Sequence, residues 1–318
     1  MIEIISATAL ATVQDLGRHG SLGYGVGTSG AMDALSLQLG NLLLGNDPGA
    51  AGIEIPLFPF EVRFTEDCTF AITGAACAAR LDGQRLPPNW VAHGRKGQVL
   101  KLTYPSSGSR AYLCLAGGVD VPQVLGSRST QLRGAFGGWQ GRALERGDII
   151  PAAHAGFDRP ADFGVVSALA ALPLSVEGRA AIRVLPAAEF ECFSARSRDE
   201  FFAAEWKITP QSNRYGYRLE GTPLLPERPL EIRSHGIVPG VIQVPHGGQP
   251  IVQMRDAQPS GGYPKFATVI DADIWRLGQA AIGSKVRFVA CSYEEALDAL
   301  ESNRAFIERT RQQLARRT

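Results

Sequence analysis

The sequence predicts a mainly β protein with a few helices, organised as two domains. Most periodic segments are short, rich in β-branched or aromatic residues, and bounded by Gly, Pro or Asp, which is typical of strands in sheets or barrels. Helical periodicity is confined to three segments. At about 150 residues per domain, a chain of 318 residues is also too long for most single cores.

The predicted strands fall into two runs along the chain. The first run covers 60–64, 69–74, 99–104 and 110–118, and the second covers 181–186, 230–234, 240–245, 250–254, 266–270 and 286–291. Between 78–81 and 84–88 stand Asp82 and Gly83, which fit a two-residue hairpin turn because Gly readily takes positive φ.

Three helices are expected. The clearest covers 30–45, with four leucines on one face, Ser29 as N-cap, Asp33 near the positive N-terminal end and Gly45 as the stop. The second covers roughly 188–205. The third covers 292–314, where Leu297, Leu300 and Ile307 are expected to face one way.

A change in composition marks the domain boundary. Residues 151–180 are rich in Pro and Ala and lose the strand periodicity. We therefore expect one domain at 1–165 and another at 180–318. Each half holds a run of strands with few helices, which suggests two similar barrels, although no repeat of fixed period is visible.

Charge and cysteine usage limit the partners and the compartment. Lys and Arg total 32 against 31 Asp and Glu, so a net charge of +1 supplies no general attraction to nucleic acid or to an acidic membrane. The five cysteines are odd in number and scattered, which favours reduced thiols in a cytoplasmic protein. Glu3 stands where a signal peptide needs a base, and no apolar run reaches the length of a membrane helix.

Several common site motifs are absent from the sequence. There is no GxxxxGK[ST] loop and no GxGxxG after a strand, so neither common nucleotide site is supported. The five histidines have no metal-ligand spacing, and we expect no metal. No GxSxG motif supports a serine nucleophile.

Two polar clusters lie in the first half. Residues 12–33 combine Gln14, Asp15 and Arg18 with six glycines before a helix N-terminus, an arrangement that suits an anion, although an ordinary capped surface loop fits equally well. Residues 125–138 hold Arg128 among hydroxyl side chains. Guanidinium groups suit carboxylates and phosphates, but loop arginines are more often solvated, and that interpretation is favoured here.

A third polar cluster lies in the second half, around the segment 254–265, which is longer than a hairpin needs. Its members converge if consecutive strands place their ends together. They are Asn213, Arg214, Gln243, Gln249, Arg255, Asp256, Gly261, Gly262, Tyr263 and Lys265. The structural alternative is an ion pair in a barrel mouth; the density of donors around a glycine pair favours a ligand site.

At these residues the sequence resembles a known family. The segments TVQDLGR, SGAMD, LGSRST, NRYGYRLEG, IQVP with GQPIV, and GGYPK followed by ATVI are similar to the biotin-dependent carboxyltransferase family of allophanate hydrolase subunit 2, KipA and the 5-oxoprolinase component PxpC. The resemblance spans about residues 1 to 290 with the motifs in order. It implies two cyclophilin-like β-barrel domains and a KipI- or PxpB-like partner protein.

The resemblance implies three functions to compare. The first is the PxpC component of an ATP-dependent 5-oxoprolinase, which opens 5-oxo-L-proline to L-glutamate and also needs a lactam-binding, PxpA-like protein. The second is the carboxyltransferase component of a urea carboxylase or allophanate hydrolase-like system. Because no lysine here has the flanking Met of a carrier site, its biotin arrives on another chain. The third is a KipA-like, non-enzymatic binder of a kinase inhibitor. The polar clusters favour the enzymes.

For the first function we expect Arg255 and Lys265 to stabilise a developing oxyanion, with Asp256 positioning or deprotonating water. Arg214 binds the substrate carboxylate, and ATP is used by the complex at a site that the sequence does not place. The remaining predicted substrate-binding residues are Gln14, Asp15, Arg18, Arg128, Asn213, Gln243, Gln249, Gly261, Gly262 and Tyr263. His235 and His246 depart from the family pattern, which leaves the identity of the substrate open.

Overall fold

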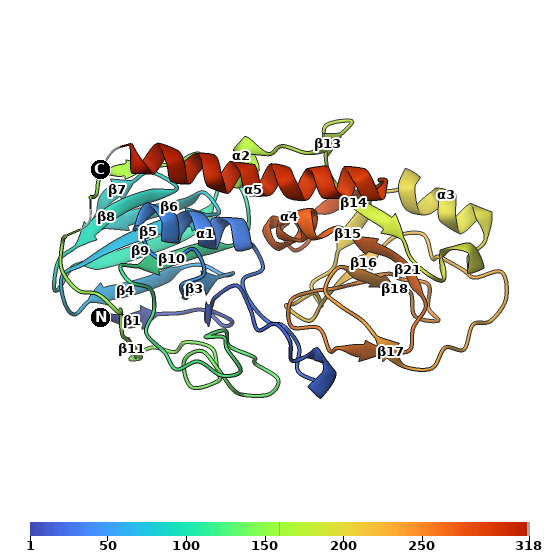
Figure 1. Cartoon of the computed structure of the whole chain (residues 1–318), viewed down its shortest axis with the longest axis horizontal. Helices are drawn as coiled ribbons and strands as arrows, with labels where there is room; N and C mark the ends of the chain where they lie inside the picture. The colour runs from blue at the N-terminus through green and yellow to red at the C-terminus, as the bar shows by residue number, and fades with distance from the viewer. Residues whose placement is uncertain (159, 317–318) are drawn as a thin grey trace. The chain divides into compact units, whose positions relative to one another are not determined.

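The computed structural model describes residues 1–158 and 160–316. The chain forms two compact units (Figure 1). Unit 1 comprises Met1–Arg18, Ser29–Leu172 and the chain from Arg304 onwards, and unit 2 comprises His19–Thr28 and Pro173–Asn303. The domain boundaries expected from the sequence, 1–165 and 180–318, stay a prediction. The units differ from them by joining 19–28 to unit 2 and the end of the chain to unit 1.

In unit 1 the described strands form two antiparallel sheets of six. The first has the order β11-β1-β4-β9-β6-β7 and the second β12-β8-β5-β10-β3-β2. The first sheet consists of β1 (Ile2–Ser6), β4 (Phe60–Phe64), β6 (Cys77–Leu81), β7 (Gln84–Leu86), β9 (Val99–Pro105) and β11 (Ile149–Ile150). The second consists of β2 (Thr12–Gln14), β3 (Gly52–Ile55), β5 (Cys68–Gly74), β8 (Trp90–Gly94), β10 (Ala111–Leu115) and β12 (Phe163–Gly164).

The core of unit 1 lies between these sheets. In β4, Phe60, Val62 and Phe64 are fully buried while the residues between them are not, as the two-residue period of a strand requires. The ring of Phe64 lies 5.0 Å from that of Phe70 on the second sheet. The predicted turn at Asp82 and Gly83 is confirmed, since both have positive φ between β6 and β7.

Helix α1 (Ala34–Leu43) covers the other face of the second sheet, across β5 and β10 (Figure 1). This is why β5 is buried along its whole length. The expected N-cap was wrong: Asp33, not Ser29, caps the helix, and its carboxylate accepts a hydrogen bond from the backbone N–H of Ser36 at 3.0 Å. Ser29 has φ of 51° and lies before the cap.

In unit 2 the main sheet closes on itself. Its order is β13-β14-β21-β18-β19-β16-β15-β22, and β14 also pairs in parallel with β22, which leaves a seven-strand barrel with β13 attached. The strands are β13 (Ser175–Val176), β14 (Arg179–Pro186), β15 (Trp206–Ile208), β16 (Gly216–Glu220), β18 (Val241–Gln243), β19 (Ile251–Gln253), β21 (Lys265–Val269) and β22 (Lys285–Ala290). A separate pair joins β17 (His235–Gly236) to β20 (Ser260–Gly261). The strand predicted at 230–234 is wrong, because this segment is a loop.

Aromatic side chains fill the barrel. Phe201 stacks on Phe288 at 4.8 Å and meets Phe266 at 4.7 Å. Phe201 comes from α3 (Ala195–Ala203), and the helix expected at 188–205 is therefore shorter, because Ser194 caps α3 after a separate turn, η2 (Phe190–Cys192). The remaining short elements are η1 (Leu22–Tyr24), α2 (Ala168–Ala171), η3 (Asp271–Asp273) and α4 (Ile274–Gln279).

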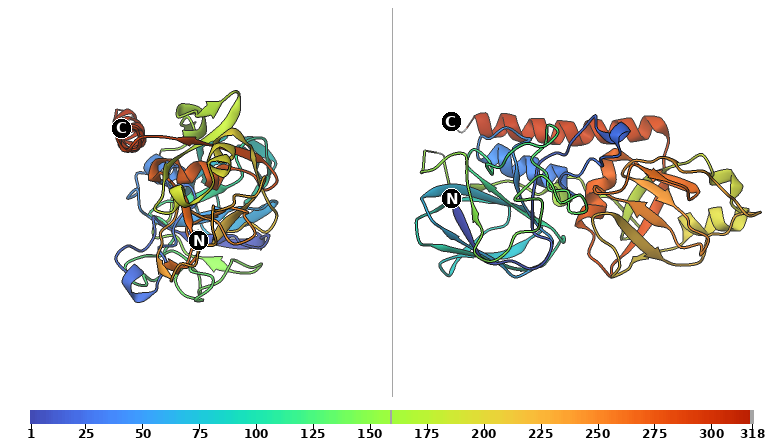
Figure 2. Two further views of the ribbon diagram at one scale, coloured as in Figure 1. Left: turned by 90° about the vertical axis from the view of Figure 1, so that its right-hand side faces the viewer. Right: turned by 90° about the horizontal axis from the view of Figure 1, so that it is seen from below.

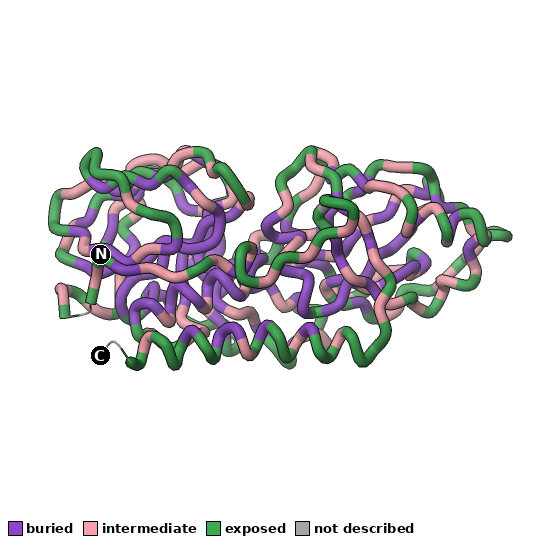
Figure 3. Tube along the Cα trace, turned by 90° about the horizontal axis from the view of Figure 1, so that it is seen from above, coloured by how far each residue is buried: buried purple, intermediate pink, exposed green. Residues whose placement is uncertain are grey.

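The C-terminal helix, α5 (Tyr293–Ala315), is one unbroken element (Figure 2). Buried and exposed residues alternate along the helix (Figure 3). Leu297, expected on the buried side, is 48% exposed, so that part of the prediction was wrong. Two polar residues, Asn303 and Thr310, are buried instead, because each donates a hydrogen bond to a backbone carbonyl. Within residues 1–158 and 160–316, no helix is long and apolar enough to cross a membrane.

Candidate functional site

Part of the third cluster gathers on the outer face of the unit 2 barrel rather than at a mouth of it. Tyr217 and Val252, in β16 and β19, are fully buried and face the barrel interior. Their strand neighbours point outward because side chains alternate along a strand. Gln243 in β18 stands opposite Ile251 in β19 and shares this outer face.

A cavity of about 240 Å³ lies over this face. Five of the predicted site residues line it: Asn213, Gln243, Gly261, Gly262 and Tyr263. Side-chain amides dominate the lining. We call it the amide cavity, after Gln211, Asn213, Gln243, Gln253 and Gln258.

Two of these amides are held in a fixed orientation. Gln253 donates from Nε2 to Oε1 of Gln243 at 3.0 Å, and Gln243 donates from Nε2 to the backbone carbonyl of Tyr263 at 3.2 Å. Because a carbonyl oxygen can only accept, this chain of bonds sets which end of each amide is oxygen and which is nitrogen. Gln243 is 3% exposed, so the pair is anchored in the protein.

Other polar groups of the amide cavity are left without a protein partner among the described residues. They are the side-chain amide of Gln211, Nδ2 of Asn213, the guanidinium of Arg218, Oε1 of Gln253 and the hydroxyl of Tyr263. The cavity therefore offers both donors and acceptors to a ligand, and Arg218 carries the one formal charge in its described lining.

The glycine pair allows a close approach. A Cβ at Gly261 would lie 2.9 Å from Nε2 of Gln243, and one at Gly262 would lie 3.0 Å from the carbonyl of Ile232. Neither glycine has positive φ, so close approach rather than a left-handed backbone explains them. The segment 254–265 thus forms one wall of the amide cavity.

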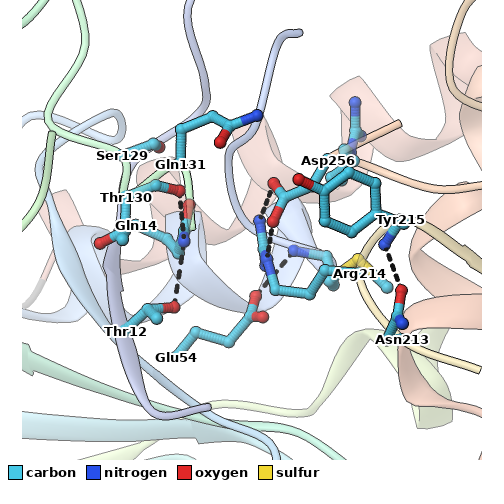
Figure 4. A network of polar contacts seen from close by, with 12 residues as sticks. Thr12, Gln14, Glu54, Ser129, Thr130, Gln131, Asn213, Arg214, Tyr215 and Asp256 are labelled. Atoms are coloured by element: carbon cyan, nitrogen blue, oxygen red, sulfur yellow. Dashed lines mark hydrogen bonds and ion pairs between the residues drawn. The ribbon is translucent and has the colours of Figure 1, made fainter. Parts of the chain in front are cut away.

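Arg214 and Asp256 form a buried ion pair in unit 2. The guanidinium donates from Nε and from Nη2 to the two carboxylate oxygens, each at 2.9 Å (Figure 4). Their side chains are 4% and 0% exposed. A bidentate pair of this kind occupies both oxygens of Asp256. The catalytic role expected for Asp256 stays a prediction, and the geometry is that of the structural alternative.

Three other predicted residues of unit 2 do not line the amide cavity. Lys265 places its ammonium 3.9 Å from the carboxylate of Glu189, which also accepts from the Lys265 backbone N–H. Gln249 exchanges two hydrogen bonds with the backbone of Gly221, both at 3.0 Å. The carbonyl of Arg255 accepts from the hydroxyl of Thr28 at 3.4 Å. Their functional roles stay predictions.

In unit 1, Asp15 organises the loop that contains Arg128. Its Oδ1 accepts from the hydroxyls of Ser127 and Ser129 at 2.7 and 2.5 Å and from the N–H of Gly17 at 2.8 Å, and its Oδ2 accepts from the N–H of Arg128 at 2.5 Å. The carboxylate is thereby satisfied by the protein itself.

Gln14 and Arg18 are also held by protein groups. Gln14 is fully buried, donates to Thr12 and to the carbonyl of Thr130 (Figure 4), and accepts from the N–H of Gly30. Arg18, 1% exposed, donates to the carbonyl of Ser129 at 2.6 Å and lies over the ring of Phe136.

A second cavity, of about 460 Å³, is lined by Asp15 and Arg128 of the predicted site residues. Asp47 and Asp120 also line it, so its lining carries carboxylates as well as one guanidinium. Arg128 donates from Nε to the carbonyl of Val121 at 2.9 Å. The structure therefore separates the predicted set into this cavity, the amide cavity and several contacts within the protein.

The prediction from sequence missed several residues that the structure places at candidate sites. In unit 2 these are Gln211, Tyr215, Arg218 and Gln253. Strand alternation in GYRLE and PIVQM is the signal that places Arg218 and Gln253 on one face.

Unit 1 holds a buried carboxylate that the sequence analysis did not select. Glu54, fully buried, accepts from the hydroxyl of Tyr112 at 2.7 Å and from the N–H of Met32 at 2.8 Å. Burial, together with Glu54 and Asp33, raises the pKa of Tyr112 well above its usual range. Tyr112 is therefore a neutral donor at physiological pH.

The five cysteines are all free thiols. Burial raises the pKa of Cys77 and of Cys114 to about 12. Since the thiolate is the reactive form, these two cysteines are poor nucleophiles near neutral pH. Among the described residues, no group of three His, Cys, Asp or Glu side chains is placed to hold a metal ion.

Comparison with known proteins places this architecture in a family. The C subunit of the 5-oxoprolinase of Escherichia coli is 44% identical over 97% of both chains, and that of Haemophilus influenzae is 40% identical over 98% of both. The crystal structure of the K. lactis urea amidolyase superposes with a TM-score of 0.88 at 30% identity, over 97% of this chain and 20% of that much longer one. The family described as carboxyltransferase domain, subdomain A and B, matches residues 24–290. This chain is a member of that carboxyltransferase domain family.

Proposed function

We propose that this chain is the C subunit of an ATP-dependent 5-oxoprolinase and that it takes part in opening 5-oxo-L-proline to L-glutamate. One observation carries the proposal: two 5-oxoprolinase C subunits match almost end to end, at 44% and 40% identity. A urea amidolyase relative from Saccharomyces cerevisiae is 33% identical and is matched over 17% of its length. The full-length match to a protein that is a separate subunit favours the oxoprolinase.

The chemistry explains why the proposed enzyme consumes ATP. A lactam is stabilised by amide resonance, so in this proposal phosphorylation of its oxygen by ATP, with release of ADP, makes the carbonyl carbon electrophilic enough for attack by water. The ring C–N bond then breaks as the nitrogen takes up a proton, and a second water hydrolyses the resulting acyl phosphate to L-glutamate and phosphate. In this proposal Arg255 and Lys265 stabilise the oxyanion that develops. Asp256 positions the guanidinium of Arg214, because both carboxylate oxygens accept hydrogen bonds from it. ATP is consumed by the assembled complex.

The proposal also includes partners and a compartment. One subunit of an oxoprolinase implies others, which we propose are a KipI- or PxpB-like protein and a lactam-binding, PxpA-like protein. The two units described above correspond in this proposal to cyclophilin-like domains, supported by the closed barrel of unit 2. Five free thiols support a reducing compartment, the cytoplasm.

Reconstitution tests the function. The purified chain is combined with the two proposed partner proteins, and glutamate release from 5-oxo-L-proline is measured with and without ATP. We expect release only with ATP and only when all three proteins are present. Full activity without this chain, or ATP-dependent release by this chain alone, contradicts the proposal.

A second function is favoured by one observation, the TM-score of 0.88 with the K. lactis urea amidolyase. In that case the chain is a carboxyltransferase that uses carboxybiotin from another protein. Incubating the chain with a carboxylated biotin carrier and urea distinguishes the two functions. Urea-dependent loss of carboxybiotin supports this second function, and none is expected under the first.

A further inference from the structure

We infer that the amide cavity of unit 2 is a binding site for a small cyclic amide that carries a carboxylate. The inference deepens the proposed function by giving 5-oxo-L-proline, or a ring of the same chemistry, a binding site in this chain that is additional to the lactam-binding partner protein and distinct from Arg255 and Lys265, which do not line the cavity. It rests on the proposed function for the choice of that ligand only. The cavity itself is argued from the residues that line it.

The hydrogen-bonding groups of the cavity are complementary to a lactam. A lactam edge presents an N–H donor beside a carbonyl acceptor. The cavity lining includes Oε1 of Gln253 as an acceptor and Nδ2 of Asn213 as a donor, the two kinds of group that such an edge needs, and among the described residues neither atom has a protein partner. Primary amides are the side chains that supply both kinds of group without charge.

The amide groups of Gln243 and Gln253 are preorganised for binding. Gln253 is held by Gln243, and Gln243 by the backbone of Tyr263, so the free oxygen of Gln253 has a set direction before any ligand arrives. Holding groups in their binding orientation removes part of the entropic cost of association. A Cβ at Gly261 would lie 2.9 Å from Nε2 of Gln243, so a side chain at this position would shift the Gln243 amide.

The charge and the volume of the amide cavity suit a small ring that carries a carboxylate. Among the described residues no carboxylate lines the amide cavity, and Arg218 is the one charged side chain that does. Its guanidinium has no partner in the described part of the chain and suits a carboxylate in two-point contact. A volume of about 240 Å³ lies below the range of roughly 300–1,000 Å³ typical of drug-sized ligands, which favours a single small ring.

Direct binding to the isolated full-length chain is the test. Ligand-observed NMR titration compares 5-oxo-L-proline with 2-pyrrolidone, which lacks the carboxylate, and with L-proline, which lacks the lactam carbonyl. We expect 5-oxo-L-proline to bind at least tenfold more tightly than either. Equal binding of L-proline, preferential binding of biotin, or no binding of 5-oxo-L-proline overturns the inference.

Variants assign the binding to this cavity. Arg218→Gln is expected to bring the affinity for 5-oxo-L-proline down to that of 2-pyrrolidone while leaving 2-pyrrolidone unchanged. Lys207→Gln is the matched control: it removes a cation from the neighbouring strand β15 outside the cavity, and it is expected to change neither affinity. Unchanged binding in Arg218→Gln overturns the inference.

A second variant tests the hydrogen bonds to the lactam edge. Gln253→Leu is expected to lower the affinity for both lactams at least tenfold. Circular dichroism and the melting temperature establish that each variant is folded. Should Gln253→Leu fail to fold, Gln211→Ala, at an exposed position lining the same cavity, is expected to weaken binding severalfold, and full affinity there overturns the inference.

The inference and the proposed function fail in different ways. A reconstituted complex that hydrolyses 5-oxo-L-proline, while this chain binds no lactam, overturns the inference and leaves the function intact. A chain that binds 5-oxo-L-proline through Arg218, in a complex that does not hydrolyse it, supports the inference and contradicts the function.

Discussion

Asp15 in unit 1 and five of the residues that line the amide cavity in unit 2 were predicted to bind a ligand, and the two regions differ in how their polar groups are used. Asp15 accepts four hydrogen bonds from its own chain. In the amide cavity, Gln253 and Asn213 each keep a polar atom that no described protein group satisfies. A satisfied buried carboxylate stabilises a loop, whereas unsatisfied groups around a cavity are available to a ligand.

Among the polar groups that are hydrogen-bonded within the protein, we expect the largest loss of stability when one partner of the Arg214–Asp256 ion pair is removed. Asp256→Ala is expected to lower the free energy of unfolding by about 3–5 kcal/mol, because it leaves a buried guanidinium without its bidentate partner. Denaturant unfolding measures this change. The double variant Arg214→Met/Asp256→Leu is the control and is expected to recover much of the loss; a small effect of Asp256→Ala would place the pair among the weak, solvated ones.

Lys265 combines a contact within the protein, a long ion pair with Glu189, with a predicted catalytic role. We expect Lys265→Ala to lower turnover of the reconstituted complex about a hundredfold, as loss of a cation facing an oxyanion does. Its free energy of unfolding should change by no more than about 0.5 kcal/mol. Lys285→Ala, which loses a similar pair with Glu205, is the control and should retain turnover. Wild-type turnover in Lys265→Ala would contradict the catalytic role, and the ion pair with Glu189 would then be the remaining role of Lys265.

Asp15→Asn probes the carboxylate of unit 1. The substitution keeps the shape but replaces one accepting oxygen by a donor, so at least one of the four hydrogen bonds is lost within a buried site. We expect a loss of about 2 kcal/mol in the free energy of unfolding. Asp120→Asn, exposed in the same cavity, is the control and should change it little. A neutral result for Asp15→Asn would reopen Asp15 as a ligand-binding group.

The contribution of Asp148 to the free energy of unfolding depends on pH. Hydrogen bonds from Arg142 hold the pKa of Asp148 below its usual value of 3.8. Its contribution is therefore present above about pH 4 and is lost as the pH falls through the lowered pKa. Asp148→Asn should cost about 1 kcal/mol near neutral pH. This difference from wild type should shrink as the pH falls below about 4, as measured by denaturant unfolding. Glu145→Gln, 3.9 Å from Arg142 and 71% exposed, is the control, and a difference independent of pH would contradict the assignment.

Two glutamines of unit 2 give the most direct comparison. Gln249→Ala loses two hydrogen bonds to Gly221 and should cost about 1–2 kcal/mol in unfolding free energy. Gln211→Ala, which removes an exposed amide without a described protein partner, should stay within about 0.5 kcal/mol of wild type. Thermal unfolding compares them. Equal losses would mean that the amide cavity is as structural as the Gln249 contact.

Local sequence was sufficient for much of the fold. Alternating apolar residues placed β4, and Asp82 with Gly83 placed the turn between β6 and β7. Both depend on interactions within a few residues, the strand period and the freedom of Gly at positive φ. The leucine pattern placed α1, but the choice between Ser29 and Asp33 as its cap needed the backbone conformation at Ser29.

Tertiary structure decided the candidate site. The sequence alone determined a mainly β chain and the polar segment 254–265. It did not determine that Gln243 and Gln253 meet on the outside of a barrel, or that Gln249 and Asp256 form their hydrogen bonds within the protein. The physical reason is that a side chain's type sets which hydrogen bonds it can form, whereas its partner is set by strand pairing between segments distant in sequence. Whether a polar residue serves the fold or a ligand depends on that pairing.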